Sequence, residues 1–249
     1  MKHNQFFGLF MARFLVWLMS PLERLLAGRV SPNAITTISL LMCGATGVMA
    51  GLGNLGAATW LYTLAGFLDI LDGRIARITN RQTASGALYD SVSDRWGELF
   101  IFTGYAWFLR DTIWLLAVMG AIGSSLMVSY TRARAEGLKL ELSGGLMQRA
   151  ERIFLCVVGT LTAAWFMADP GTRDGGVVIL GGTMGLLAVA STVTAVGRWV
   201  IAYRILAKRD AESLPKLDEP APVKKPAVAQ PEIFAPVPKA LRESAELPL

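Results

Sequence analysis

Long apolar segments alternate with short polar stretches along most of the chain. The segments are 19 to 29 residues long, and an α-helix needs about 20 residues to cross the hydrocarbon core of a bilayer. The pattern predicts six such helices, at residues 35–53, 56–78, 86–108, 112–134, 150–168 and 176–204. Ser31-Pro32-Asn33 precedes the first segment, and proline is favoured at the first position of a helix. We therefore expect an all-α integral membrane protein with six transmembrane helices.

The two ends of the chain differ from this pattern. Residues 1–29 mix aromatic and apolar residues with lysine and arginine, which predicts an amphipathic helix on the membrane surface. A further transmembrane span is the alternative for this segment. Eight of the eleven prolines lie between Pro215 and Pro248. This composition predicts a disordered cytoplasmic tail at 208–249, which leaves 30–207 as the membrane domain.

The distribution of charge sets the expected orientation and excludes several chemistries. Lysine and arginine gather in alternate loops, so the positive-inside rule predicts that both termini are cytoplasmic in a cell membrane. The net charge of +5 then fits an anionic membrane surface better than nucleic acid. His3 is the single histidine, which excludes a histidine nucleophile and a histidine-rich metal site. Cys43 and Cys156 are isolated in apolar segments and indicate no disulfide framework.

Four aspartates stand at the polar ends of the second and third segments. Asp69 and Asp72 are three residues apart, and Asp90 and Asp94 are four apart, so each pair shares one helix face. If the two helices form an antiparallel hairpin with its loop near residues 79–84, the pairs lie at matched depths. We therefore expect the four carboxylates to converge between the two helices, at the cytoplasmic end of the membrane.

We expect a cluster of this kind to bind cations. Buried carboxylates repel one another, and each buried charge is costly unless it is paired or bound to metal. Ligands that are all oxygen favour hard ions, Mg²⁺ or Mn²⁺. Two divalent cations per site are a known device for displacement at phosphorus. The residues thus predict a dimetal site that acts on a phosphate ester.

The stretch Asp69-x2-Asp72-Gly73-x2-Ala76-Arg77-x8-Gly86-x3-Asp90-x3-Asp94 resembles the signature of the CDP-alcohol phosphatidyltransferase family, with every fixed position present. The resemblance covers roughly residues 30–204. It implies a six-helix membrane fold, usually a homodimer, and transfer of a phosphatidyl group from CDP-diacylglycerol to an alcohol with release of CMP. It further implies that Mg²⁺ or Mn²⁺ binds the diphosphate and lets CMP leave.

The resemblance also implies a role for each residue of the motif. Asp69, Asp72 and Asp90 would hold the metals, while Asp94 would share the metal site and act as the general base on the acceptor hydroxyl. The residues expected around the CDP part are Gly73, Ala76, Arg77, Gly86 and Asn33.

Two further segments bear on the acceptor alcohol. Ser129-Tyr-Thr-Arg132-Ala-Arg-Ala-Glu136 and Gln148-Arg149-Ala-Glu-Arg152 resemble the phosphatidylinositol-phosphate synthase subgroup, although that subgroup has Glu-Arg-Pro-Glu-Arg in the second segment. The residues expected to bind a phosphate on the acceptor are Arg132, Arg149, Arg152 and Arg198. The alternative is that the positive-inside rule alone places these arginines.

The predicted function is transfer of a phosphatidyl group to inositol 1-phosphate. A glycerol 3-phosphate acceptor, as in phosphatidylglycerophosphate synthase, or another alcohol keeps the same chemistry. Two alternatives from other classes are a cation-binding channel or transporter, and a catalytically silent scaffold that recruits partners through its tail. The expected partners are the lipid substrate, a phosphorylated polyol, the bilayer and a second copy of the chain.

Overall fold

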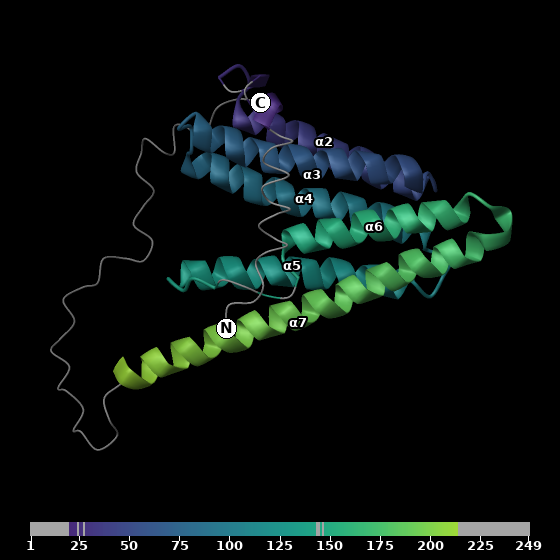
Figure 1. The fold of residues 1–249 in the computed structure, drawn as a ribbon. Coiled ribbons are helices and arrows are strands. Elements are labelled where there is room, and N and C mark those ends of the chain that lie inside the picture. Colours follow the sequence, from purple (N-terminus) through teal and green to yellow (C-terminus); the bar gives the residue numbers. More distant parts are fainter. Residues whose placement is uncertain (1–19, 24, 27, 143–144, 146, 214–249) are drawn as a thin grey trace, which may run out of the picture. The chain divides into compact units, whose positions relative to one another are not determined.

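The computed structural model describes residues 20–23, 25–26, 28–142, 145 and 147–213, and in this part of the chain it is helical, without strands. Each of the six predicted segments corresponds to one α-helix (Figure 1). The elements are α2 (Pro32–Gly51), α3 (Leu55–Ile78), α4 (Ala84–Phe108), α5 (Leu115–Gly137), α6 (Arg149–Met167), the short 3₁₀ helix η1 (Pro170–Thr172) and α7 (Arg173–Ser213).

Capping side chains fix where three of the helices begin. Ser31 caps α2 with Pro32 at its first position, as the sequence predicts. Asn54 caps α3 and Thr83 caps α4. In all three caps the side-chain oxygen accepts a hydrogen bond from the backbone N–H three residues further on, at 3.0–3.2 Å. Each cap satisfies a backbone donor that has no partner within its own helix.

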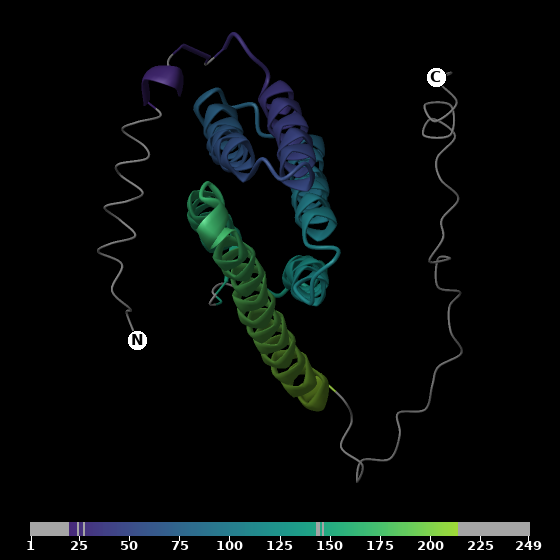
Figure 2. The same cartoon turned by 90° about the vertical axis from the view of Figure 1, so that its right-hand side faces the viewer.

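The helix α2 is central to the part of the bundle that carries the aspartates. It packs along both α3 and α4, and Figures 1 and 2 show the three helices side by side. Within the described helices, α3 and α4 are not themselves a closely packed pair. The sequence-based prediction of an α3–α4 hairpin that encloses the carboxylates is therefore incomplete, because α2 is the helix that holds the two in place.

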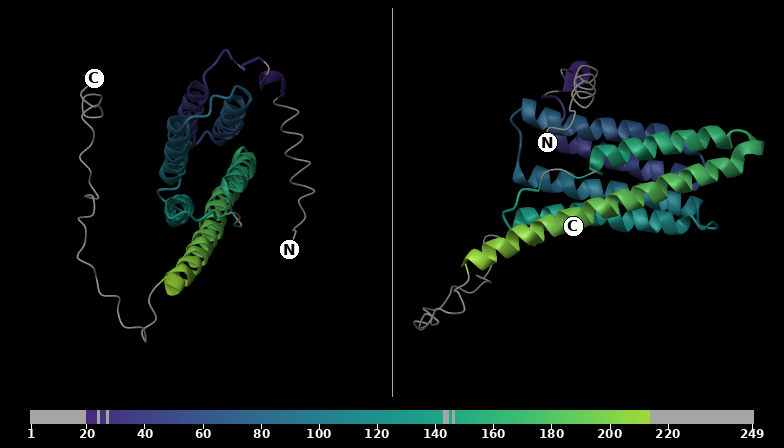
Figure 3. Two further views of the ribbon diagram at one scale, coloured as in Figure 1. Left: turned by 90° about the vertical axis from the view of Figure 1, so that its left-hand side faces the viewer. Right: turned by 60° about the horizontal axis from the view of Figure 1, so that its bottom comes forward.

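The remaining helices extend this group. The helix α6 packs against α3, and α5 packs against α4. Figure 3 shows α7 running alongside α5 and α6. Apolar side chains from several of these helices meet in one buried core, which includes Tyr105, Leu109, Val118, Leu180 and Met184. The core places the beginning of α6 next to the aspartates of α3 and α4.

Four helices are long and apolar enough to cross a membrane: α2, α5, α6 and the helix that spans Pro170–Glu212. The other two, α3 and α4, each carry four charged residues, including the aspartates. Large apolar side chains such as Trp60, Leu116 and Trp165 are exposed on the described helices. Exposed apolar side chains on long apolar helices are typical of a surface that faces lipid.

The two ends are only partly described. The predicted surface helix at 1–29 lies mostly outside the described residues, although residues 20–23 and 25–26 are helical. The contacts divide the chain into two units, Met1–Ile205 and Leu206–Leu249. In the second unit the described residues are the last turns of α7, which continues to Ser213, past the expected domain boundary at 207. The rest of the predicted tail, from 214 to 249, lies outside the described residues.

Two glycines allow the backbones of α2 and α4 to touch. A Cβ atom on Gly104 would overlap the carbonyl oxygen of Gly47, and a Cβ on Gly47 would overlap the carbonyl oxygen of Phe100. We expect Gly104→Ala to separate the helices and to destabilise the protein by about 1–3 kcal/mol or more, the range for overpacked cores. Thermal unfolding in detergent would show a lower midpoint.

The matched control is Gly182→Ala in α7. No neighbouring atom lies within 4 Å of a Cβ built at Gly182, so this substitution removes a glycine from a helix without a clash. If Gly104→Ala unfolds at the same temperature as Gly182→Ala, the close approach of α2 and α4 is not what limits stability.

Candidate active site

Three aspartates from two helices meet in one cluster. Asp69 on α3 and Asp90 and Asp94 on α4 can each place a carboxylate oxygen within 4.8 Å of the other two, and all three are half-buried. The prediction that the four carboxylates converge is thereby confirmed for these three, while Asp72 lies outside the cluster. The spacing of three or four residues brings each pair to one helix face, and α2 holds the two faces toward each other.

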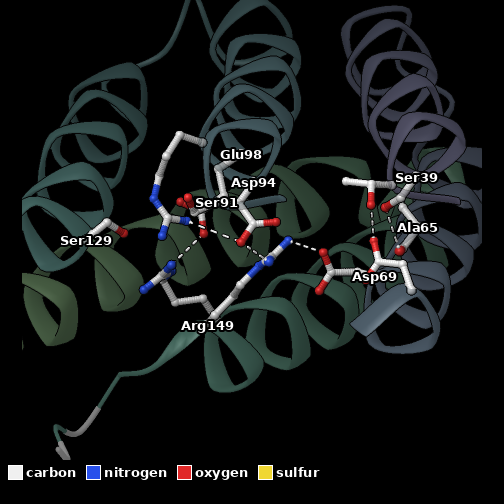
Figure 4. Close-up of polar contacts among 12 residues, drawn as sticks. Ser39, Ala65, Asp69, Ser91, Asp94, Glu98, Ser129 and Arg149 are labelled. Atoms are coloured by element: carbon white, nitrogen blue, oxygen red, sulfur yellow. Dashed lines mark hydrogen bonds and ion pairs between the residues drawn. The ribbon is translucent and has the colours of Figure 1, made fainter. Parts of the chain in front are cut away.

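The fourth aspartate, Asp72, is buried and is held by α2. Its Oδ2 accepts a hydrogen bond of 2.5 Å from the Thr36 hydroxyl, whose oxygen also lies 3.2 Å from the backbone oxygen of Pro32. One turn further along α2, the Ser39 hydroxyl donates to the backbone oxygen of Ala65 at 2.9 Å (Figure 4). These two hydroxyls tie α2 to the helix that carries Asp69 and Asp72.

A cavity of about 290 Å³ opens beside Asp72 and Asp90, between the beginnings of α2 and α4 and the end of α3. All five residues predicted to surround the CDP part line it, namely Asn33, Gly73, Ala76, Arg77 and Gly86. The structure thus brings these residues together with two of the aspartates in one cavity. Thr36 and Arg81 line the same cavity.

The two glycines of this cavity act in different ways. A Cβ atom on Gly73 would meet only the end of the Arg77 side chain, at 4.0 Å, so glycine there keeps the cavity wide. A Cβ on Gly86 would lie 2.9 Å from the Thr83 hydroxyl and 3.5 Å from the Asn33 side chain. Glycine at position 86 therefore lets the start of α4 keep its cap and stay close to α2.

Arg149 reaches into the aspartate cluster from the first residue of α6. Its Nη2 donates to Asp69 Oδ1 at 2.7 Å, and its Nη1 pairs with Asp94 Oδ2. Figure 4 shows the guanidinium lying between these two carboxylates. Arg95 adds a second positive charge, with its Nη1 3.9 Å from Asp94. The electrostatic repulsion within the cluster is therefore offset by arginine in this structure.

The other three predicted acceptor arginines each have a partner of their own. Arg152 is buried and pairs with Glu98 at 2.5 Å. Arg198 is buried and donates to the backbone oxygen of Val128 at 3.1 Å. Arg132 is exposed and pairs with Glu136, one turn along α5, at 2.8 Å. The structure thus brings only one of these four described arginines into contact with the aspartates.

Sequence reasoning did not single out Thr36 or Glu98. Thr36 ends the segment Pro32-Asn33-x-x-Thr36, from which only Asn33 was assigned, so its spacing from Asn33 was the available signal. Glu98 stands four residues after Asp94, and residues four apart share a helix face, so it could have been grouped with the aspartates.

The donor set fits a hard divalent cation. The cluster offers carboxylate oxygens, and such ligands favour Mg²⁺ or Mn²⁺. The Arg149 guanidinium between Asp69 and Asp94 shows that a positive charge is accommodated at this position. Together, the carboxylates and the adjoining cavity make a site where a cation and a phosphate ester can meet.

Comparison with known proteins supports this interpretation. A family model described as CDP-alcohol phosphatidyltransferase matches residues 29–197. The archaetidylinositol phosphate synthase of Methanothermobacter thermautotrophicus is 38% identical over 141 residues, which cover 57% of this chain and 70% of that protein. The phosphatidylinositol phosphate synthase of Streptomyces avermitilis is 35% identical over 211 residues, which cover 80% of this chain and 83% of that protein.

Solved structures of one relative have the same fold. The crystal structure of Mycobacterium tuberculosis phosphatidylinositol phosphate synthase with CDP-DAG bound matches with a TM-score of 0.64 and 29% identity, over 74% of this chain and 93% of that one. The same enzyme in complex with manganese and citrate matches with a TM-score of 0.64 and 28% identity, over 74% and 88% of the two chains. The family model matches more than half of the residues of this chain. The chain therefore belongs to the CDP-alcohol phosphatidyltransferase family, the transferases of phospholipid biosynthesis.

Proposed function

We propose that this protein transfers the phosphatidyl group of CDP-diacylglycerol to inositol 1-phosphate and releases CMP. The observation that carries the proposal is the aspartate cluster. On one side the cluster adjoins the cavity lined by Gly73 and Gly86, and on the other side it contacts Arg149. The names of the relatives favour an inositol phosphate acceptor.

The nucleotide end of the lipid would bind in the 290 Å³ cavity. Gly73 leaves its wall open to a flat base or a diphosphate, and Asn33 offers an amide to hydrogen-bond with the nucleotide. Arg77 and Arg81 contribute positive charge next to a diphosphate in the same cavity. The diphosphate would then lie beside Asp72 and Asp90, where a metal ion can reach it.

Asp69, Asp72, Asp90 and Asp94 would hold the divalent cations, which we propose to be two Mg²⁺ or Mn²⁺ ions. Such ions, when bound, supply charge neutralisation to the diphosphate and to the departing CMP. Thr36 donates to Asp72 and so leaves its other oxygen, Oδ1, available as a ligand. The chain therefore offers oxygen ligands from both α3 and α4, with α2 as their support.

Asp94 is the proposed general base. It would take the proton from the acceptor hydroxyl, whose oxygen then forms a bond to the phosphorus of the phosphatidyl group as the bond from that phosphorus to CMP breaks. Arg149, which already contacts Asp94, would bind the phosphate carried by the acceptor and so place the hydroxyl near the base. If Arg132, Arg152 and Arg198 are also to bind this phosphate, each of them must leave its present partner.

The proposed topology has six transmembrane helices in a cell membrane, with both termini cytoplasmic. We count α3 and α4 among the transmembrane helices because their acidic residues face inward. Asp72 is buried, and Asp69, Asp90 and Asp94 are half-buried. The exposed faces of the same helices carry Trp60 and Trp107. We further propose a surface helix at 1–29, a membrane domain at 30–207, a disordered tail at 208–249, and a homodimer.

The acceptor is tested by CMP release from the purified full-length chain with CDP-diacylglycerol and Mg²⁺. Inositol 1-phosphate, glycerol 3-phosphate, inositol and serine are supplied in separate reactions. We expect release with inositol 1-phosphate and little with unphosphorylated inositol, because Arg149 favours an acceptor that carries a phosphate. Release with glycerol 3-phosphate alone would keep the aspartate chemistry and refute the proposed acceptor.

The general base is tested by Asp94→Asn, which keeps the size of the side chain and removes the basic oxygen. We expect turnover to fall by about 10²–10⁴-fold, the usual contribution of general base catalysis, while the unfolding temperature changes little. The matched control is Asp111→Asn, because Asp111 is exposed and its ion pair with Arg110 lies away from the site. Wild-type turnover in Asp94→Asn would remove Asp94 from the mechanism.

The metal requirement is tested by chelation. Treatment with EDTA should abolish CMP release, and added Mg²⁺ or Mn²⁺ should restore it. The metal-free protein should stay folded, since Arg149 and Arg95 still offset the carboxylate charge. Full turnover in the metal-free protein would exclude the proposed metal site.

A further inference from the structure

We propose that Glu98 and Arg152 form a positioning pair, which holds Arg149 at the aspartate cluster. In this arrangement Arg152 acts through Arg149 and is not itself a ligand of the acceptor phosphate. The inference rests on the proposed function, because it assigns Arg149 to the acceptor side of the site. It gives a role to Glu98, which the aspartate motif does not include.

The first observation is the burial of the pair. The side chain of Arg152 is 3% exposed and that of Glu98 is 9% exposed, and Arg152 Nη2 donates to Glu98 Oε1 at 2.5 Å. Glu98 Oε2 and Arg152 Nε are buried without any other partner among the described residues. Removing one member of the pair would therefore leave a buried charge without its hydrogen bond, and such a charge is costly.

The second observation is the register of the two helices. Glu98 follows Asp94 by four residues on α4, and Arg152 follows Arg149 by three residues on α6. The two ion pairs, Asp94 with Arg149 and Glu98 with Arg152, therefore link the same helix faces on successive turns. The helix α6 packs closely against α3, whereas side chains link it to α4 in the described structure, namely these two ion pairs and the hydrogen bond of 2.7 Å between Tyr105 and Thr160.

The third observation is the position of Arg149 at the beginning of α6. The preceding residue, Gln148, makes no side-chain capping hydrogen bond, so the first turn lacks the support that Ser31, Asn54 and Thr83 give to other helices. The Glu98–Arg152 pair lies one turn further in and fixes that turn to α4. Asp69, Asp94, Glu98 and Arg149 line one small cavity, so a shift of the inner pair would reach the aspartates directly.

The test compares Arg149→Gln, Arg152→Gln and Glu98→Gln, together with the double variants Arg149→Gln/Arg152→Gln and Glu98→Gln/Arg152→Gln. Arg110→Gln is the matched control, because it removes an arginine from an exposed pair. Each full-length protein is assayed for kcat, for the KM of inositol 1-phosphate and of CDP-diacylglycerol, and for Mn²⁺ affinity by electron paramagnetic resonance.

We expect Arg149→Gln to raise the KM of the acceptor by about 10-fold or more, the effect of losing one charged hydrogen bond. Glu98→Gln and Arg152→Gln should each raise the same KM without changing that of CDP-diacylglycerol. The double variant Arg149→Gln/Arg152→Gln should be no worse than Arg149→Gln, because the two residues act in sequence. Glu98→Gln/Arg152→Gln, which restores a neutral hydrogen-bonded pair, should recover a KM near that of the wild type.

The Mn²⁺ titration makes the same comparison without turnover. Arg149→Gln removes a positive charge from between Asp69 and Asp94, so Mn²⁺ should bind several-fold more tightly. If the pair positions Arg149, Glu98→Gln and Arg152→Gln should shift the affinity in the same direction. Arg110→Gln should leave it unchanged.

The opposite pattern would overturn the inference. If Arg152 binds the acceptor phosphate itself, Arg152→Gln raises the KM, Glu98→Gln does not, the neutral pair fails to rescue, and the effects of Arg149→Gln and Arg152→Gln multiply. If the pair serves stability alone, the unfolding temperature falls while KM and Mn²⁺ affinity stay at wild-type values. A wild-type protein that binds Mn²⁺ but releases no CMP with any acceptor would count against the proposed function, while the Mn²⁺ titration still decides the role of the pair.

Discussion

The main constraint on the structure is that carboxylates of like charge lie close together in a partly buried site, where little water can screen them. Four carboxylates on two helices repel one another, and their repulsion grows as the local dielectric falls. The chain offsets this with Arg149 and Arg95 at the cluster and with a hydroxyl donor from Thr36 to the buried Asp72. A site balanced in this way is poised for cations, because a divalent ion can supply the charge that arginine supplies here.

The same constraint explains the arrangement of the helices. If α3 and α4 packed directly on each other, the carboxylates would be forced together and no ligand could enter. Instead α2 packs against both helices, and its glycine contact with α4 at Gly47 and Gly104 brings the backbones close away from the aspartates. The space that remains near Asp72 and Asp90 is the cavity to which we assign the nucleotide.

The sequence predicted the helices and the aspartate cluster well because both follow from local rules. Apolar length and the Ser31-Pro32 cap indicate where a helix lies, and spacing of three or four residues indicates which carboxylates share a face. The place of α2 between α3 and α4 is tertiary and has no such local signal. The contacts of the arginines could not be predicted from the sequence either. An arginine near the end of a membrane helix can set the topology, bind a phosphate or form an ion pair, and the sequence does not distinguish these roles.

The arginines of α6 show how burial separates these roles. Arg149 and Arg152 lie three residues apart in one segment, and composition alone treats them alike. In the fold, Arg149 keeps 30% of its side chain exposed and meets the aspartates, whereas Arg152 keeps 3% and meets Glu98. A group that must bind and release a phosphate needs access to solvent, and a group that holds a helix in register does not. One turn of helix therefore separates the arginine to which we assign the acceptor phosphate from the arginine to which we assign a positioning role.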